Sequence, residues 1–583
     1  MATVAQARRT RRSWLSRIDQ RHVIVYGTAL VLAVTVVVPL AVMVIISLRP
    51  TEAIPPITGT DFTLDNYRTT FADPVTYRLL WNTALYALGS MAVGLVLGVL
   101  MSWFVGRTNL PFRNGVYPMA LASFAMPGVV TAFGWIVLGR PRTGILNTII
   151  RGMTGSDANT GPLNVFTLEG MILVTGVALA GSMFIFLAPY FQRMDPALEE
   201  AATTSGAGRL GTLRHVSIPL LFPGILTVAV YYVVIMVQIF EFPLAIGVTA
   251  GVPVLSVRVF LLTQPEFGLI NYGLAATFAM IAMFIGLVLL GVYLWVTRQA
   301  ERYQVITGKG YRPNRMDLGF WKWPAAVFVF GIFGIKIILP LLALIWASLL
   351  LYFQPLSMDA LSLVSLDNYR SVFGSERIRN SLLNTVLLVT LAPTLSILLA
   401  ALVAWASTRI KLRGVRMLEV LAFMPLAIPG IVMGLAMLVT LIRTPIWGSV
   451  WIIIIGHTIG FLPFGVRLLS AAMLQIGREL EEAGSTSGAT PLTIFRVVML
   501  PLVLPAFLNG WLWVFAHSIR DFTYPLLFST PDNAVLATQI WELWTTPDIP
   551  KGSALSVLLV VFLMAFVFVI RKTATRFFGG TVT

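Results

Sequence analysis

One short acidic, glycine-containing stretch occurs twice in this chain. Residues 199–208 read EEAATTSGAG and residues 481–490 read EEAGSTSGAT, with seven of the ten positions identical. Glutamates at the start of a helix are stabilised by its macrodipole, and glycine allows a helix to end in a left-handed conformation. Small side chains let a partner's backbone approach closely. These residue types suit docking rather than catalysis, so we predict a short surface helix in each copy.

Four ionisable residues in otherwise apolar stretches are candidates for a translocation pathway: Glu241, His517, Arg520 and Asp521. Burying a charge inside a membrane is costly, about 2.5–3.5 kcal/mol at mid-helix on insertion scales. Glu241 and Asp521 each follow the proline that opens their apolar segment by about twenty residues, which places them near the outer end of a helix rising ~1.5 Å per residue. Two acidic residues there could attract a cation. The alternative is that both are hydrated, structural residues of the interface.

Metal binding and catalysis find little support in the sequence. The chain has no cysteine, and neither His457 nor His517 has a second histidine at a helical spacing such as i+4. The sequence has no nucleophile motif and no pair of catalytic carboxylates. Lys336 is expected to extend toward the interface or to pair with a neighbouring helix. We therefore expect no enzyme activity, no bound metal and no cofactor in this chain.

The composition is that of a protein dissolved in lipid. Hydrophobic residues make up 57% of the 583 residues and charged residues only 11%, whereas soluble domains contain about 25% charged residues. The net charge of +16 comes from short Lys and Arg clusters beside long apolar runs, as in the cytoplasmic loops of membrane proteins. The charge therefore reports membrane topology and does not indicate nucleic-acid binding.

About twelve apolar segments approach the ~20 residues that a spanning helix needs. They lie near 23–47, 79–104, 116–138, 168–190, 219–241, 272–296, 324–350, 380–406, 417–441, 449–471, 501–528 and 552–570. Continuous apolar runs exclude a membrane barrel, whose strands alternate polar and apolar residues. Basic residues cluster before the first segment and after alternate segments, so both termini and both copies of the repeated stretch are predicted to face the cytoplasm.

The chain is a tandem duplication. LDNYR at 64–68 recurs at 366–370, and Arg107 and Pro127-Gly128 recur as Arg409 and Pro429-Gly430, all 302 residues apart. Glu199 pairs with Glu481 and Pro219 with Pro501, 282 residues apart. The change of offset indicates an insertion in the first half, in the polar external loop 142–164. The LDNYR segments are read either as amphipathic surface helices or as contacts for an external partner.

Six spans per half make the repeat parallel, related by an axis along the membrane normal. We therefore predict an all-α integral membrane protein divided as follows: a basic cytoplasmic N-terminus at 1–22, a first half at 23–297 with its cytoplasmic loop at 191–218, a cytoplasmic linker at 298–323, and a second half at 324–583 with its loop at 473–500.

Both cytoplasmic loops resemble the EAA loop of type I ABC importer permeases. Glu200-Ala201-Ala202, three residues, Gly206, nine residues and Val216-Ser217-Ile218-Pro219 follow that pattern, and the run from Glu482-Ala483-Gly484 through Gly488 to Pro501 repeats its spacing. Gly484 replaces the second alanine, Val216 and Val498 replace isoleucine, and Ile218 replaces leucine. The resemblance implies coupling to an ATPase through ten residues: Glu199, Glu200, Ala201, Ala202, Gly206, Glu481, Glu482, Ala483, Gly484 and Gly488.

The same resemblance implies the partners. In that family the loop is a coupling helix seated on the ATP-hydrolysing subunit, so this fused permease is expected to bind a dimer of ATP-binding-cassette subunits. ATP is expected on those subunits and not in this chain. A periplasmic or extracellular binding protein is expected to deliver the substrate, and the localisation expected is the bacterial cytoplasmic (inner) membrane, in contact with lipid.

The substrate is less closely specified. The segment 516–544, with Arg520-Asp521, Ser529-Thr530-Pro531 and WELW at 541–544, is similar to the matching part of fused ferric-iron permeases. Permeases for thiamine, polyamines and phosphonates share much of this pattern and remain alternatives. A major-facilitator-like secondary transporter would also have two six-span halves. Such transporters usually carry a Gly-x-x-x-Asp-Arg/Lys loop between the second and third spans, but here that loop, residues 105–115, reads VGRTNLPFRNG and has no aspartate. A secondary transporter also gives no reason for the two repeated stretches.

Overall fold

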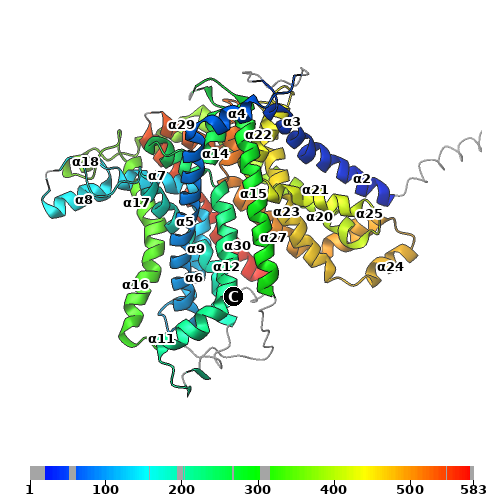
Figure 1. Cartoon of the computed structure of the whole chain (residues 1–583), viewed down its shortest axis with the longest axis horizontal. Helices are drawn as coiled ribbons and strands as arrows, with labels where there is room; N and C mark the ends of the chain where they lie inside the picture. The colour runs from blue at the N-terminus through cyan, green and yellow to red at the C-terminus, as the bar shows by residue number, and fades with distance from the viewer. Residues whose placement is uncertain are drawn as a thin grey trace, which may run out of the picture. The chain divides into compact units, whose positions relative to one another are not determined.

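The computed structural model describes residues 20–50, 61–156, 158–193, 201–202, 204–265, 268–301, 316–546 and 548–577. Within these ranges every regular element is a helix, and the pairing of Thr108 with Met316 is an isolated bridge. Nine of the described helices are long and apolar enough to cross a membrane, and three bent helix pairs raise the number to twelve at most. The all-helical membrane fold predicted from the sequence is confirmed (Figure 1).

The chain folds into two compact units. Unit 1 contains residues 1–67, 262–283 and 381–535, and unit 2 contains the rest. The helices of unit 1 are α2 (Gln20–Leu32), α3 (Val38–Ser47), α21 (Val415–Ala427), α22 (Gly430–Leu441), α23 (Val450–Leu474), α24 (Glu479–Thr486), α25 (Pro491–Ile494), α26 (Leu500–Leu502), α27 (Leu504–Arg520) and α28 (Thr523–Leu527).

Unit 2 holds most of the first half and the ends of the second. Its helices are α5 (Pro74–Arg107), α6 (Val116–Ala122), α7 (Gly128–Gly139), α8 (Ile145–Thr154), α9 (Leu168–Arg193), α11 (Arg209–Thr212), α12 (Ile218–Gln238), α13 (Val248–Ala250), α14 (Leu255–Leu261), α16 (Lys322–Phe333), α17 (Leu339–Ser348), α18 (Met358–Ser362), α19 (Asp367–Gly374), α29 (Leu536–Thr545) and α30 (Ile549–Phe577). Three helices have residues in both units: α4 (Asp65–Ala72), α15 (Tyr272–Glu301) and α20 (Glu376–Arg409).

The compact units cross the boundary between the repeat halves. In unit 1, α3 from the first half packs against α22 from the second, and in unit 2, α17 from the second half packs against α7 from the first. The first span of each half therefore lies in the same unit as the broken third span of the other half: α3 with α21 and α22 in unit 1, and α17 with α6 and α7 in unit 2. The division at 23–297 and 324–583 stays a prediction about the repeat, and residues 1–19 and 302–315 of the predicted terminus and linker lie outside the described residues.

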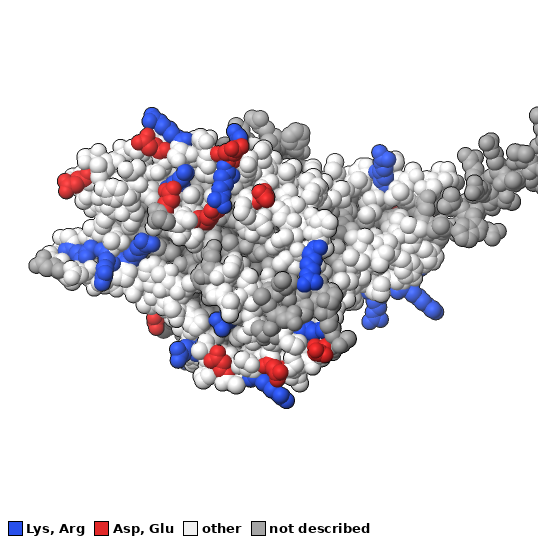
Figure 2. Space-filling model, turned by 90° about the horizontal axis from the view of Figure 1, so that it is seen from above, with Lys and Arg blue, Asp and Glu red and all other residues white. Residues whose placement is uncertain are grey.

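Side chains sort as expected for a lipid-facing protein. On the face drawn in Figure 2, Lys, Arg, Asp and Glu occupy scattered positions and most of the described surface carries none of them. Many large apolar residues are exposed along the helices, such as Leu30, Phe284 and Val327 at 65%, 68% and 74%. In water such exposure would be unfavourable, but hydrocarbon solvates these side chains.

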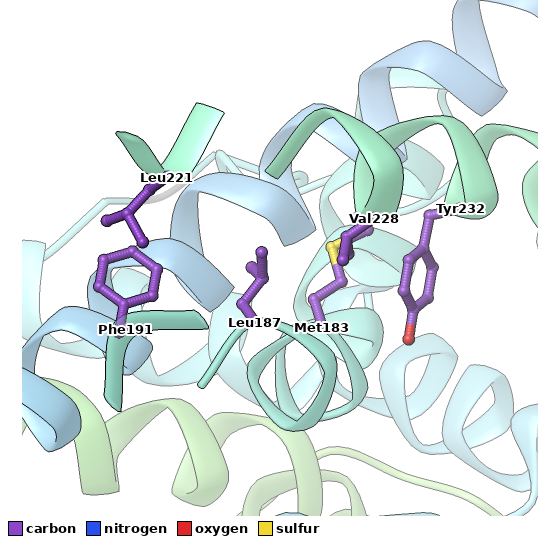
Figure 3. Close-up of a cluster of buried hydrophobic side chains, with 6 residues drawn as sticks. All are labelled: Met183, Leu187, Phe191, Leu221, Val228 and Tyr232. Atoms are coloured by element: carbon purple, nitrogen blue, oxygen red, sulfur yellow. The ribbon is translucent and has the colours of Figure 1, made fainter. Parts of the chain in front are cut away.

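The core of unit 2 depends on small residues. α5 packs along α9, and Gly98 of α5 lies so close that an added Cβ would come within 2.8 Å of the Cβ of Met183. Met183 also joins Leu187 and Phe191 of α9 and residues of α12 in a buried apolar cluster (Figure 3). Because lipid tails are as apolar as leucine, such helices associate through close packing, which glycines permit.

Four of the five π-helical turns in the described residues end two residues before a proline. The turns are Ala33–Val37, Leu213–Ser217, Gly334–Ile338 and Phe495–Met499, and they precede Pro39, Pro219, Pro340 and Pro501. Proline has no amide hydrogen to donate, and its ring clashes with the carbonyl four residues earlier. The wider π turn takes up this mismatch without ending the helix. The duplication thus extends to irregularities within the helices.

Three of the predicted spans are not continuous helices. The predicted span 116–138 divides into α6 and α7, and 417–441 divides into α21 and α22, which meet at 109°. Both breaks fall before the repeated Pro-Gly pair, where Pro127 and Pro429 adopt an extended ψ of 145° and 138° as N-caps. The predicted span 501–528 bends by 77° near Val503. Residues 243–261, not predicted as a span, form a further pair bent by 84°.

The repeated LDNYR segments cap the C-terminal ends of the helices that precede them. α4 and α19 are short helices, and the side-chain amide of Asn66 donates to the carbonyls of Ser47 and Arg49 at 3.1 and 2.6 Å. Asn368 donates in the same way to the carbonyls of Ser348 and Leu350 at 2.9 and 2.7 Å. Helix ends leave carbonyls without partners, and these asparagines satisfy them. This motif therefore has a structural role.

The first-half insertion contains a helix that its own polar residues hold in place. The Asn147 amide donates to the carbonyls of Arg140 and Leu163 at 2.9 and 2.7 Å, and its oxygen accepts from the Leu163 amide. Arg151 donates to the carbonyls of Arg142, Ala158 and Asn159. The loop predicted as long and polar thus contains the helix α8, which these hydrogen bonds hold in place.

A bulky residue at Gly134 is expected to destabilise unit 2. A Cβ at this position would lie 2.5 Å from the Cβ of Pro340 and 2.8 Å from its carbonyl oxygen, so α7 and α17 would have to separate. Overpacking of this kind costs about 1–3 kcal/mol. We expect G134L to lower the melting temperature of the purified chain. The matched control is G331L, a helical glycine with no atom within 4 Å of an added Cβ; equal melting temperatures for the two variants would contradict the prediction.

Candidate functional site

The second repeated stretch forms a helix that ends at a glycine. α24 spans Glu479–Thr486 and has no buried residue. Gly488 has φ +82°, its amide donates to the Ser485 carbonyl at 3.0 Å, and the Ala489 amide donates to the Gly484 carbonyl at 3.1 Å. These two bonds around a left-handed glycine define a Schellman motif. The predicted helix and the predicted conformation of its glycine are both present.

The first stretch ends in the same way. Gly206 has φ +87°, and the Ala207 amide donates to the Ala202 carbonyl at 3.0 Å, which corresponds to the bond between Ala489 and Gly484. Glu199 and Glu200 lie outside the described residues, so this loop is described from Ala201 onward with a gap at 203. The two loops therefore share the geometry of their helix ends.

Small residues also let the second loop fold back on itself. An added Cβ at Gly484 would lie 3.1 Å from the Cγ1 atom of Ile494 in α25. Gly484 is the position at which this loop departs from the Glu-Ala-Ala pattern, and the close approach of α24 to α25 gives a physical reason for the departure. Glu482 and Ala483 lie on the exposed part of the helix. The exposed surface of the loop thus carries an acidic residue and small residues.

Asp521 forms a polar pair in the apolar interior of unit 1. Its Oδ2 atom lies 3.0 Å from Nε2 of His457 and accepts the amide of Tyr524 at 3.2 Å. His457 is fully buried in α23, and its other ring nitrogen, Nδ1, is buried without a hydrogen-bond partner. The Asp521 side chain is 20% exposed. The pair therefore joins a buried imidazole to a carboxylate that reaches the surface of the described chain.

The other candidates of this segment lie beside that pair. His517 and Arg520 occupy the last turn of α27. The His517 ring stacks on Trp513 with centroids 3.7 Å apart and contacts Phe461 at 6.0 Å, while Phe461 contacts His457 at 5.5 Å. From the sequence, Asp521 was expected to act with Glu241, and no role was expected for His457. His457 could have been found as a histidine between two glycines, Gly456 and Gly460, inside an apolar span.

Glu241 belongs to unit 2 and has a different setting. An added Cβ at Gly128 would overlap its carboxylate, so the charge lies against the first residue of α7. The positive end of a helix stabilises a carboxylate there, typically by 0.3–1 kcal/mol and up to ~2 kcal/mol when partly buried. Lys336, also in unit 2, is buried and donates from Nζ to Oγ of Ser123 at 3.0 Å, which agrees with the expected pairing to a neighbouring helix.

The described residues contain no group of three or more His, Cys, Asp or Glu side chains that could hold a metal ion. The expectation that this chain binds no metal is therefore not contradicted by the part of the chain that the structure covers. His457 and Asp521 together supply two potential ligands, which is fewer than a structural site uses.

The family description "Binding-protein-dependent transport system inner membrane component" matches the chain in two segments, residues 94–303 and 396–577. The chain belongs to this family. The first segment covers most of the predicted first half and runs into the predicted linker, and the second lies in the predicted second half. Each contains one of the repeated loops, which confirms a fused permease with two halves. The first span of each half, His22–Ser47 and Gly319–Ser348, lies outside the matched segments.

Relatives of this family member include permeases with different named substrates. The chain is 24% identical over 424 residues to the ferric transport system permease protein FbpB of Actinobacillus pleuropneumoniae, which covers 69% of this chain and 58% of that protein. It is 27% identical over 208 residues to the spermidine/putrescine transport system permease protein PotC of Haemophilus influenzae, covering 36% of this chain and 80% of that protein. The match to the ferric permease thus spans little more than half of that protein's length.

Among solved structures, a bacterial ABC transporter involved in the import of the acidic polysaccharide alginate is similar to 51% of this chain and 99% of its own, at 17% identity and a TM-score of 0.39.

Proposed function

We propose that this chain is the membrane permease of an ATP-driven, binding-protein-dependent importer. The observation that supports this most directly is the pair of loops with the EAA pattern, one in each family segment and each with a left-handed glycine at the same position, of which the second forms the exposed helix α24. Each loop would seat on one subunit of an ATP-binding-cassette dimer. A displacement of the two loops would then alternate the access of a central pathway between the two sides of the membrane.

The proposal includes the orientation of the chain. Basic clusters flank both loops and both termini, so these parts would face the cytoplasm, with localisation in the bacterial inner membrane. A separate binding protein would deliver substrate to the opposite face. The chain itself would hydrolyse no ATP, because nucleotide binding would lie on the partner subunits.

Ferric iron is the proposed substrate. The segment 516–544, which contains Arg520-Asp521 and WELW, resembles ferric permeases, and a ferric permease is among the relatives. The candidate pathway residues are Glu241, His517, Arg520 and Asp521, and we add His457 because its Nε2 atom lies 3.0 Å from Asp521. A polyamine importer is the second candidate, because a spermidine/putrescine permease is also a relative; thiamine and phosphonate importers share the same architecture.

Reconstitution tests this proposal against a secondary transporter. The chain is purified with the ATPase that accompanies it and inserted into vesicles with its binding protein. ATP inside the compartment that corresponds to the cytoplasm is expected to drive uptake of radioactive ferric iron, with spermidine uptake measured in parallel. Accumulation by the chain alone down a proton or sodium gradient, without ATP, would overturn the importer assignment.

A further inference from the structure

Arg409 ends α20 and is almost fully buried at the cytoplasmic end predicted for unit 1. Its side chain is 7% exposed. One guanidinium nitrogen, Nη2, donates to the carbonyls of Met473 and Ile476 at 2.7 and 2.6 Å, at the end of α23. Its Nε atom lies 2.8 Å from Oε1 of Glu481 in the first turn of α24. A single side chain therefore joins three helices.

The two hydrogen bonds from Arg409 to the carbonyls are strong and directional. The last carbonyls of a helix carry partial negative charge, and the planar guanidinium presents its donors in a fixed fork. The Nε–Oε1 contact is close but lacks hydrogen-bond alignment, because both atoms are buried without a hydrogen-bond partner. Glu481 therefore acts on Arg409 as a counter-ion, with a side chain that is 17% exposed.

A hollow lies beside the ion pair. It has a volume of about 290 Å³, and its lining includes Trp405, Arg409, Glu481 and Ile494. α24 itself has no buried residue. The contact to Arg409 is thus a principal attachment of the first turn of α24 to the membrane-spanning helices, rather than one of many contacts in a packed core.

We propose that Arg409 is a positioning residue that ties the coupling loop to the ends of α20 and α23, so that a displacement of α24 moves both spans together. This inference rests on the proposed function of the loop. The repeat extends it to the first half: Arg107 corresponds to Arg409 at 302 residues and Glu199 to Glu481 at 282. Arg107 ends α5 and is 4% exposed, and Glu199 lies outside the described residues.

A distance measurement tests the anchor without any ATPase. Because the chain has no cysteine, spin labels can be placed on K411C and T486C, which lie just after α20 and at the end of α24. In R409Q and E481Q the distribution of label distances is expected to become at least twofold broader. R478Q removes the same charge from an exposed position of the same loop and is expected to leave it unchanged. Unaltered distributions in R409Q and E481Q would overturn the inference.

Transport separates the anchor from a merely structural role. In the reconstituted complex, uptake per ATP hydrolysed is expected to fall roughly 5- to 150-fold in R409Q, the range of typical coupling energies. R409K keeps the positive charge but not the forked donors of the guanidinium. It is expected to restore part of the uptake per ATP that R409Q loses. The double variant R409M/E481M removes both charges, which commonly restores the stability lost with one partner, yet uptake per ATP should stay low. Recovery of coupling in that variant would overturn the anchor.

The two proposals fail in different ways. Broadened distances in R409Q together with uptake that ignores ATP would leave the anchor standing and refute the importer. ATP-driven uptake that is the same in R409Q and R478Q, with unchanged distances, would leave the importer standing and refute the anchor.

Discussion

Replacing Gly206 and Gly488 together with valine is expected to abolish most ATP-driven uptake while the chain still inserts into the membrane. Both glycines have positive φ, +87° and +82°. A left-handed conformation costs a residue with a Cβ about 1–2 kcal/mol, and a β-branched residue tolerates it least. The combined cost of roughly 3 kcal/mol for the two loops corresponds to about a hundredfold loss of ATP-driven uptake. Uptake by the reconstituted complex and the amount of chain in the membrane fraction measure the two parts of this prediction.

Asparagine at the same two positions is the matched control. No atom lies within 4 Å of an added Cβ at either glycine, so any cost in the free chain comes from the backbone. Asparagine adopts the left-handed conformation more readily than valine, and G206N/G488N is therefore expected to keep most of its uptake. Equal loss in both double variants would show that the glycines matter as contact surface for the ATPase and not through the helix end.

Neutralising Asp521 is expected to lower uptake of a cationic substrate at least tenfold. D521N keeps oxygen and shape, so it can still accept hydrogen bonds from His457 and Tyr524, but it removes the charge. A unit charge at 4 Å contributes about 1 kcal/mol in water and ~4 kcal/mol at an effective dielectric constant of 20, and 1.4 kcal/mol corresponds to a tenfold change. Uptake of ferric iron at fixed ATP is the measurement.

Two further variants show how the pair works. H457F keeps a ring of similar size in α23 but cannot contact the carboxylate, and it is expected to lower uptake less than D521N because the charge remains. D532N removes a carboxylate from an exposed position in the following loop and is expected to have no effect. If D521N and D532N transport equally well, Asp521 is a structural residue and lies outside the substrate's path.

Local sequence features predicted local structure well. The LDNYR repeat marked two short helices, and the glycines of the repeated loops have the left-handed conformation that helix ends favour. The duplication itself followed from constant spacings, and the family match likewise falls in two segments, each with one copy of the repeated loop. These features depend on residues that are close together in the chain, so they can be recognised from the sequence alone.

Contacts between residues that are far apart in the chain could not be predicted from the sequence. His457 and Asp521 are 64 residues apart, and Arg409 and Glu481 are 72 apart, and no periodicity relates the members of either pair. Hydropathy also failed where a helix breaks, because Pro127-Gly128 and Pro429-Gly430 lie inside apolar runs of sufficient length for a span. The exchange of α3 and α17 between repeat halves arises only when the whole chain packs.

Cross-linking of the two loops tests the central claim most directly. The chain has no cysteine, so S205C and S487C each introduce a unique thiol beside Gly206 and Gly488. In membranes that contain the complete transporter, both are expected to cross-link to the ATP-binding subunit, with a yield that changes when ATP is added. Labelling of either thiol in intact cells by a reagent that cannot cross the inner membrane, with no cross-link to that subunit, would contradict the claim.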